Sequence, residues 1–213
     1  MQSNVDMKTV AAFDFDGTIT YRDTLIPFLR RSCGFGGLGL AIARSSRELA
    51  LFALGRMSNE AAKQRLIGAA LAGKDKAVLQ GIAKDWIAGI PLRPDVLERL
   101  KWHKQAGHHC IMVSASPDVY LEAMASRLGF DALVCTQLEV GQTGLLTGRF
   151  ATPNCWGSEK VRRLQEQVGP LDQIELHAYG DSAGDYAMLE AADHAWFKGK
   201  PHQGRRGTTK ADA

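Results

Sequence analysis

Two carboxylates stand where an apolar strand is expected to end. Asp14 and Asp16 follow the mostly apolar run of residues 8–13, and Gly17 then permits the tight turn that exposes a strand tip. Such a pair of oxygen donors suits Mg²⁺, a hard cation that keeps coordination positions open for water and phosphate. Taken alone, the pair also fits a solvated strand end or a helix N-cap at Asp16 or Thr18.

A second pair of acids lies at the end of a second predicted strand. The apolar stretch 174–179 leads into a polar turn, Gly-Asp-Ser-Ala-Gly-Asp, that carries Asp181 and Asp185. One such pair fits a capping cluster. Two pairs at the ends of parallel strands would repel each other and raise their pKa values unless a cation lay between them. The sequence therefore favours a bound metal.

Two further segments offer groups that bind anions. The predicted strand 108–114 runs into Ser114-Ala115-Ser116-Pro117, which places a hydroxyl and free N–H groups ahead of a helix and suits a phosphate. By itself this segment also fits an N-cap with proline in the first turn. Lys160 lies in the first turn of the helix predicted over 159–168, where the helix dipole disfavours a cation. We therefore expect Lys160 to reach an anion, although a solvated surface lysine fits as well.

The elements that must position these groups follow an α/β rhythm with one long interruption. From residue 91 onward, helices and strands alternate as in a parallel sheet, whose ligands bind at the carboxyl ends of the strands. A hairpin is predicted over 137–150. Between the first strand and residue 91, four helices without an intervening strand predict a helical bundle. The predicted helices cover 24–34, 38–54, 59–71 and 76–88, and the predicted domains are a core of 1–20 and 91–198, a cap of 21–90 and a disordered tail of 199–213.

In combination, these motifs resemble those of the haloacid dehalogenase-like (HAD) hydrolase superfamily, in its phosphoserine-phosphatase-like branch, subfamily IB. The resemblance implies an α/β fold, with a Rossmann-like parallel-sheet core and an inserted, all-helical, four-helix cap of the C1 type. It also implies a Mg²⁺-dependent phosphatase that works through an aspartyl-phosphate. Asp14 would be the nucleophile, Asp16 the general acid and then the base, and Lys160 a third catalytic group. The implied metal residues are Asp14, Asp16, Asp181 and Asp185, and the implied substrate or phosphate contacts are Thr18, Asp23, Ser114, Ala115 and Lys160.

The predicted cap bears on the substrate. Residues 19–90 hold eleven lysines and arginines against five acidic residues, a net charge of +6 that attracts anions. The positions that would read phosphoserine in that branch hold Asp23, Ala115-Ser116 and Gly184 instead. We therefore expect a small anionic phosphorylated metabolite, and a specificity that is not strictly for phosphoserine. A lipid phosphatase is an alternative, because residues 156–160 and 194–196 resemble those of phosphatidylglycerophosphate phosphatases. A phosphotransferase and a non-catalytic phosphate-binding regulator are the others.

The composition of the chain limits its possible partners and its cellular location. The 213 residues carry a net charge of only +3, which argues against nucleic acid as a partner. The four cysteines form no Cys-x-x-Cys pair, which predicts reduced thiols and a cytoplasmic protein. The N-terminus does not make a signal peptide, and charged residues break the apolar stretch 37–54 into halves too short to span a bilayer. Peripheral membrane contact stays open, and we expect a monomer or homodimer.

Overall fold

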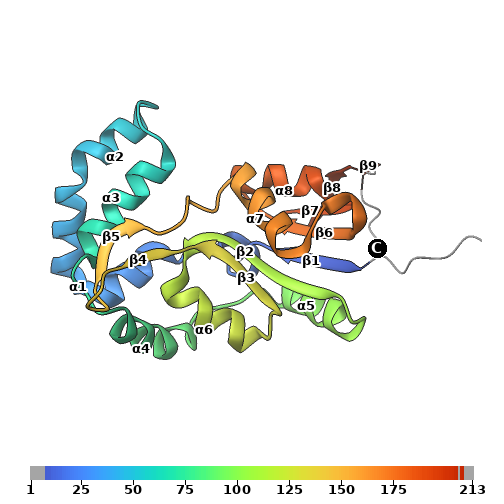
Figure 1. The fold of residues 1–213 in the computed structure, drawn as a ribbon, viewed down its shortest axis with the longest axis horizontal. Helices are drawn as coiled ribbons and strands as arrows, with labels where there is room; N and C mark the ends of the chain where they lie inside the picture. The colour runs from blue at the N-terminus through green and yellow to red at the C-terminus, as the bar shows by residue number, and fades with distance from the viewer. Residues whose placement is uncertain (1–7, 206, 209–213) are drawn as a thin grey trace, which may run out of the picture.

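A computed structural model describes residues 8–205 and 207–208, and its centre is a seven-stranded sheet in the order β3-β2-β1-β6-β7-β8-β9 (Figure 1). The first five strands of this order are parallel, as the α/β rhythm predicts. The central strand β1 pairs with β2 on one side and β6 on the other. The parallel strands are β1 (Thr9–Phe13), β2 (His109–Pro117), β3 (Ala132–Thr136), β6 (Glu175–Gly180) and β7 (His194–Phe197).

Helices cover both faces of the sheet, with α5 (Pro94–Gln105) and α6 (Asp118–Leu128) on one face and α7 (Ser158–Val168) and α8 (Tyr186–Ala191) on the other (Figure 1). Successive side chains of a strand point to opposite faces. Phe13 accordingly packs in the cluster beside α5 and α6, and Ala12 in the cluster beside α7 and α8. Both are fully buried, which explains why β1 is a continuous apolar run.

Four helices lie between β1 and α5, so the predicted inserted helical cap is confirmed. They are α1 (Leu25–Arg44), α2 (Ser46–Ala53), α3 (Asn59–Leu71) and α4 (Lys76–Ile87). The predicted break near Gly34 is a kink with φ of +71°, but the chain returns to helix and α1 continues to Arg44. The second break comes at the fully buried Ser45, which divides the helix predicted over 38–54.

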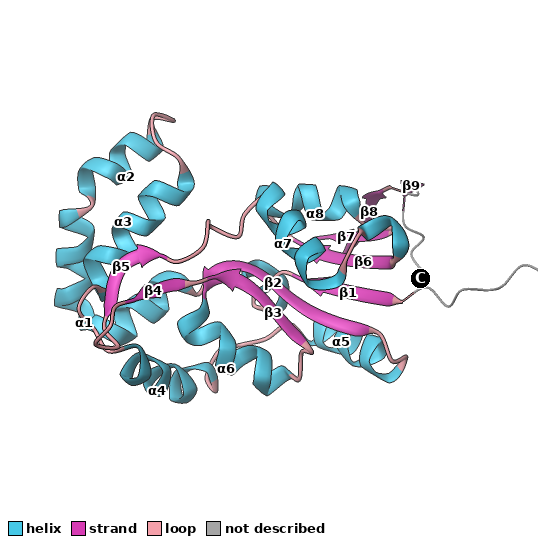
Figure 2. Ribbon diagram, in the orientation of Figure 1, coloured by secondary structure: helices cyan, strands magenta, loops and turns pink. Residues whose placement is uncertain are grey.

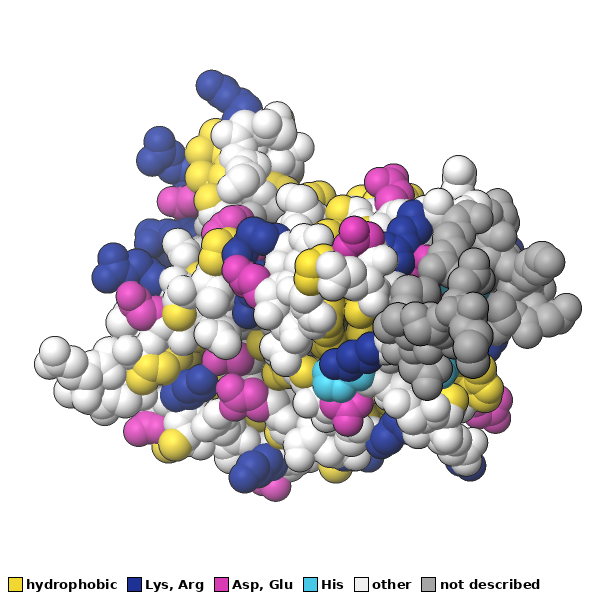
Figure 3. All heavy atoms as spheres, turned by 45° about the vertical axis from the view of Figure 1, so that its right-hand side comes forward, with side chains coloured by type: hydrophobic (Ala, Val, Ile, Leu, Met, Phe, Trp, Pro, Cys, Tyr) yellow, Lys and Arg dark blue, Asp and Glu magenta, His cyan; other side chains and the backbone are white. Residues whose placement is uncertain are grey.

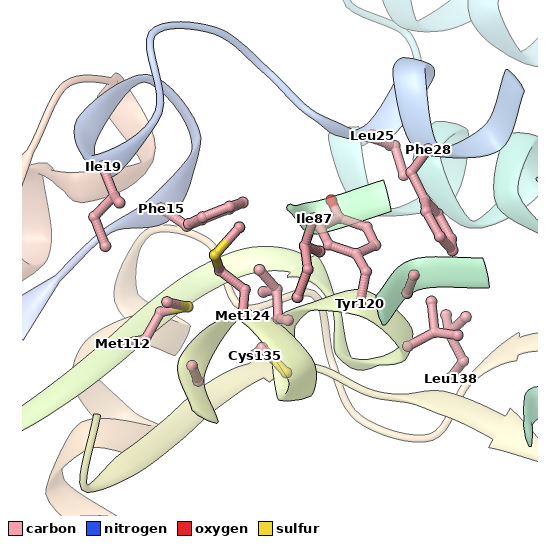
Figure 4. Close-up of a cluster of buried hydrophobic side chains, with 14 of the residues drawn as sticks. Phe15, Ile19, Leu25, Phe28, Ile87, Met112, Tyr120, Met124, Cys135 and Leu138 are labelled. Carbon is pink, nitrogen blue, oxygen red and sulfur yellow. The ribbon is translucent and has the colours of Figure 1, made fainter. Parts of the chain in front are cut away.

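Helix α4 buries a narrow apolar face. Leu79, Ala83 and Ile87 are buried as their helical spacing indicates, but Val78 is 62% exposed. Figure 4 shows Phe28, Ile87 and Tyr120 among the side chains that meet between the cap and α6. The rings of Phe28 and Tyr120 lie 4.7 Å apart and both are fully buried. These apolar contacts hold the cap against the core.

The predicted hairpin forms, with strands β4 (Leu138–Val140) and β5 (Leu146–Phe150). It extends from the core and lies against the cap helices (Figure 2). The N–H of Phe150 donates to Gln64 Oε1 at 2.9 Å, and the N–H of Gly73 donates to the Leu146 carbonyl at 2.8 Å. The cap is therefore held by a segment far from it in sequence, and the exact domain boundaries stay a prediction.

The prediction of a disordered tail over 199–213 is wrong for the part that the structure describes. Strand β8 (Lys200–Gly204) adds antiparallel to β7, and β9 (Gly207–Thr208) adds to β8. Polar composition hid these strands, which satisfy the backbone groups of an otherwise open sheet edge. Residues 206 and 209–213 lie outside the described residues.

The cysteines and the helices bear on two further predictions. All four cysteines are free, and three of them, Cys110, Cys135 and Cys155, are buried, as predicted for reduced thiols. Among the described helices, none combines the length and the apolar character that crossing a bilayer requires.

Candidate active site

A cavity of about 480 Å³ opens at the carboxyl ends of β1, β2 and β6, between the core and helices α2 and α3. This is the edge of a parallel sheet where ligands bind. Most of the residues predicted from sequence meet there, although they are up to 167 positions apart in the chain. Those that line the cavity are Asp14, Asp16, Asp23, Ser114, Ala115, Lys160 and Asp181.

Lys160 reaches the centre of the site from the first turn of α7. Its Nζ lies 2.6 Å from Asp14 Oδ1 and 2.6 Å from Asp185 Oδ1, and it donates to the Val113 carbonyl at 3.0 Å. The side chain is 2% exposed. Burial opposes its charge, but the two carboxylates outweigh burial and raise the pKa of Lys160 well above its usual value. Lys160 therefore reaches an anion, as its place in the sequence predicts, and it contacts two carboxylates.

The acidic groups outnumber the cation. One carboxylate oxygen from each of Asp14, Asp181 and Asp185 lies within 4.8 Å of the others. Burial is the largest influence on Asp14 and raises its pKa to about 8, with Lys160 opposing it. Burial also raises the pKa of Asp181. Among the described residues, Lys160 is the one ammonium in contact with these carboxylates. In their ionised form the three carboxylates would carry two negative charges more than Lys160 balances, which fits a divalent, oxygen-seeking ion such as Mg²⁺.

Asp185 and Thr18 lie behind the residues that line the cavity and are not themselves part of the lining. Asp185 Oδ2 accepts hydrogen bonds from the N–H groups of Asp181 and Ser182, at 3.1 and 3.0 Å, and from the Ser182 hydroxyl at 2.9 Å. Asp185 is fully buried, so it supports the acidic turn after β6 from within. Thr18 Oγ1 lies 3.5 Å from Asp181 Oδ1. The predicted contact of Thr18 with substrate therefore has no support from its position.

Gly17 is required by both conformation and space. Its φ is +79°, in the region that favours glycine. A Cβ at this position would lie 2.1 Å from Asp181 Oδ2. The turn after β1 can therefore approach the turn after β6 only without a side chain, and this close approach brings the two acidic pairs together.

Asp16 is held by two residues that the sequence did not single out. Its Oδ1 accepts from the N–H and the hydroxyl of Thr24, at 2.7 and 2.6 Å, and its Oδ2 accepts a short hydrogen bond from the Ser116 hydroxyl. Burial, followed by the charge of Asp23, raises the pKa of Asp16. A carboxyl group with a raised pKa that is oriented in this way is suited to donating and accepting a proton. The Ser-x-Ser motif at the end of β2 could have indicated Ser116 from the sequence. No sequence pattern indicated Thr24.

Lys63 is a further cation that only the structure brings to the cavity. It lies on α3, and its Nζ donates to the Ala115 carbonyl at 2.7 Å, across the boundary between cap and core. Burial is the largest influence on it and lowers its pKa. Asp23 is exposed at the rim and its Oδ1 also caps α1 through the N–H of Leu25, at 2.9 Å.

Known proteins are similar to this chain over most of its length. A family model described as haloacid dehalogenase-like hydrolase matches residues 11–190. Protein CicA of Caulobacter vibrioides is 34% identical over 203 residues, which cover 90% of this chain and 88% of that protein. A probable phosphatase of Mycobacterium tuberculosis is 29% identical and is matched over 88% of this chain and 68% of its own length.

Solved structures share the fold. A protein from Bordetella pertussis Tohama I superposes with a TM-score of 0.76 at 24% identity, over 89% of each chain. A phosphoserine phosphatase in its apo form superposes with a TM-score of 0.63 at 19% identity, over 89% of this chain and 86% of that one. With its helical cap, its parallel core and a family match that spans both, the chain belongs to the haloacid dehalogenase-like hydrolases.

Proposed function

We propose that this protein hydrolyses phosphomonoesters with Asp14 as the nucleophile. One observation carries the proposal: the Asp14 carboxylate ends the central strand at the cavity, 2.6 Å from the Lys160 ammonium, with Asp16 two residues further on in the same lining. An acid at Asp16 favours phosphate ester hydrolysis over dehalogenation, because an alcohol leaving group needs a proton and a halide does not.

The proposed hydrolysis has two steps, formation of an aspartyl-phosphate on Asp14 and its hydrolysis by water. Asp14 attacks phosphorus and the bond from phosphorus to the alcohol oxygen breaks, while Asp16 gives its proton to that oxygen. Asp16 then takes a proton from water, which attacks the aspartyl-phosphate and releases inorganic phosphate and free Asp14. Lys160 and the Ser114 hydroxyl offset the charge of the transferred phosphoryl group.

Mg²⁺ is the proposed cofactor. Asp14, Asp181 and the main-chain carbonyl of Asp16 would hold it, with Asp185 behind them. Bound there, it would draw negative charge from the phosphoryl oxygens and orient them toward Asp14. The cluster of three carboxylates supports this assignment, since it carries more negative charge than Lys160 balances.

A generic aryl phosphate tests the proposal. Purified protein should release phosphate in the presence of Mg²⁺ and stop when EDTA is added. Asp14→Asn should lower kcat by about 10³-fold or more, because the amide is a poor nucleophile. The matched control is Asp172→Asn, on an exposed turn, which should leave kcat unchanged. Full turnover by Asp14→Asn would exclude this mechanism.

The lining of the cavity supports a particular kind of leaving group. Arg22 and Lys63 bring positive charge, and Leu49, Phe52 and Trp156 bring apolar surface. Figure 3 shows basic side chains spread over the upper part of the helical end of the molecule. We therefore infer an anionic, partly apolar phosphomonoester other than phosphoserine. A panel of phosphoserine, sugar phosphates, histidinol phosphate and nucleotides ranks these classes, and added alcohols reveal any phosphotransfer.

A lipid phosphate is the second candidate, and the outer surface of the cap favours it. Phe35 on α1 is 79% exposed, and Leu54, directly after α2, is 71% exposed. The same two helices carry Arg31 and Arg47. Phe52 lines the cavity and is 41% exposed, so apolar surface continues from the cavity to the exterior. Turnover of phosphatidylglycerophosphate in mixed micelles that greatly exceeds turnover of its water-soluble headgroup would support this candidate. Equal rates would reject it.

A further inference from the structure

Four of the six histidines gather on the face of the sheet that α5 covers. His103 lies on α5, His108 precedes β2, His177 lies on β6 and His194 begins β7. The ring centroids of His177 and His194 are 4.5 Å apart. These two residues lie near the amino ends of their strands, whereas the candidate active site lies at the carboxyl ends. Glu175, where β6 begins, is six residues before Asp181, or about 20 Å along an extended strand.

The backbone brings three potential metal ligands together. Glu175 and His177 are two residues apart on β6 and share one face, and His194 is the register partner of His177 on β7. Glu175 Oε1 lies 3.1 Å from His194 Nε2 and 3.9 Å from His177 Nε2. Ligand atoms of a tetrahedral Zn²⁺ site stand about 3.3 Å apart, given metal–ligand distances of 2.0–2.1 Å. All three ligand atoms lie within 4.8 Å of one another, and the two distances from Glu175 are already close to this spacing.

His177 lacks the hydrogen bonds that a buried imidazole normally makes. It is 4% exposed, and its Nδ1 has no partner among the described residues. Its Nε2 points at Glu175 Oε1, but the 3.9 Å separation is too long for a hydrogen bond. In a neutral ring, the lone pair of Nε2 is then available to a metal that lies between these atoms.

Neighbouring groups fix the three ligands and leave an approach from solvent. Thr9 Oγ1 donates to Glu175 Oε2 at 3.2 Å, which leaves Oε1 directed at the two rings. Trp196 stacks on His177 with the ring planes 9° apart. The side chains of His194 and Glu175 are 26% and 34% exposed. A metal could therefore enter and keep a water ligand.

We propose that Glu175, His177 and His194 form a second metal site, for Zn²⁺ or a similar divalent transition metal, separate from the candidate active site. Two imidazoles and one carboxylate favour such a metal over Mg²⁺, which prefers oxygen ligands alone. The bound ion would join the amino ends of β6 and β7. Because the site is assembled only by the folded sheet, binding would stabilise the folded protein.

Co²⁺ is the probe, because a tetrahedral Co²⁺ site absorbs strongly in the visible range and an all-oxygen octahedral site does not. Untagged full-length protein is freed of metal, kept in excess Mg²⁺ and titrated with Co²⁺. We expect absorption that saturates at one equivalent, is displaced by Zn²⁺ and accompanies a rise in Tm. Asp14→Asn should bind Co²⁺ equally well, which separates this site from the proposed nucleophile.

Two variants at the exposed side of the cluster locate the site without disturbing the core. His194→Gln and Glu175→Gln should each weaken Co²⁺ binding at least tenfold and abolish the Zn²⁺-dependent rise in Tm. The control is His109→Gln, which removes a half-buried histidine from the opposite face of the sheet and should change neither. The proposal is wrong if Co²⁺ gives no tetrahedral spectrum, or if both cluster variants bind it as tightly as the wild type.

Discussion

The proton-transfer role proposed for Asp16 depends on Thr24, which donates to Asp16 Oδ1 through both its N–H and its hydroxyl. Thr24→Val keeps the shape and removes the hydroxyl. We expect kcat on an aryl phosphate to fall about tenfold, since a hydrogen bond to a charged group contributes about 1.5–3 kcal/mol. Thr147→Val is the control, because the Thr147 hydroxyl lies far from the cavity and bonds to the half-buried Glu139 and to the N–H of Arg149. An unchanged kcat would show that Thr24 does not position Asp16.

The charge of Lys63 is expected to contribute to the binding of anionic substrates. Its ammonium lines the cavity and bonds to Ala115 in the core. Lys63→Met keeps the length of the side chain and removes the charge, so kcat/KM for anionic phosphomonoesters should fall about tenfold. Lys84→Met, on the exposed side of α4, is the matched control and should leave kcat/KM unchanged. Equal values for all three proteins would exclude Lys63 from substrate binding.

Between elements, the contact of α3 with the hairpin relies on two glycines. A Cβ on Gly68 would lie 2.6 Å from the Gly148 carbonyl oxygen, and Gly148 has φ of +88°. Gly68→Ala must push β5 away from α3, and we expect it to destabilise the protein by about 1–3 kcal/mol. Urea unfolding at equilibrium measures this change.

Gly81→Ala is the control for that prediction. Gly81 lies within α4, is exposed and has open space where a Cβ would be. Alanine there should stabilise the helix by about 0.5–1 kcal/mol. If both alanine variants shifted stability in the same direction, close packing of α3 on β5 would not be the cause.

For the whole molecule, Arg205 ties the C-terminal strands to the core. It donates to Asp193 Oδ1 at 2.8 Å and to the Leu171 and Ile174 carbonyls at 2.6 and 2.7 Å. Asp193 is 2% exposed. Arg205→Met leaves a buried carboxylate without this guanidinium and should lower the free energy of unfolding by about 3 kcal/mol.

The control for Arg205 is Arg162, which forms ion pairs with Glu159 and Glu166 on the surface of α7. Arg162→Met should lower the free energy of unfolding much less, because solvent screens exposed pairs. Thermal unfolding of both variants measures the difference. Equal, small losses would mean that β8 and β9 contribute little to the stability of the fold.

Most of the fold was predictable because it rests on local patterns. The buried parallel strands are short apolar runs, and the cap helices α3 and α4 begin at Ser58 and Asp75, whose side chains accept from the first-turn N–H groups. The division of the predicted helix 38–54 at Ser45 and the exposure of Val78 were not predictable. Both depend on which neighbours an element meets, and periodicity does not carry that information.

The sequence alone determined which residues could carry the proposed chemistry of the site. Asp14, Asp16, Lys160 and Asp181 are predictable because each sits at the end of a strand or the start of a helix, where local pattern shows that a polar group is out of place. The tertiary structure decided which groups serve them. Thr24, Ser116 and Lys63 reach the site through side chains whose partners lie 8, 100 and 52 positions away, and β8 exists only because β7 offers an open edge. Such contacts are set by the packing of whole elements, which no short stretch of sequence encodes.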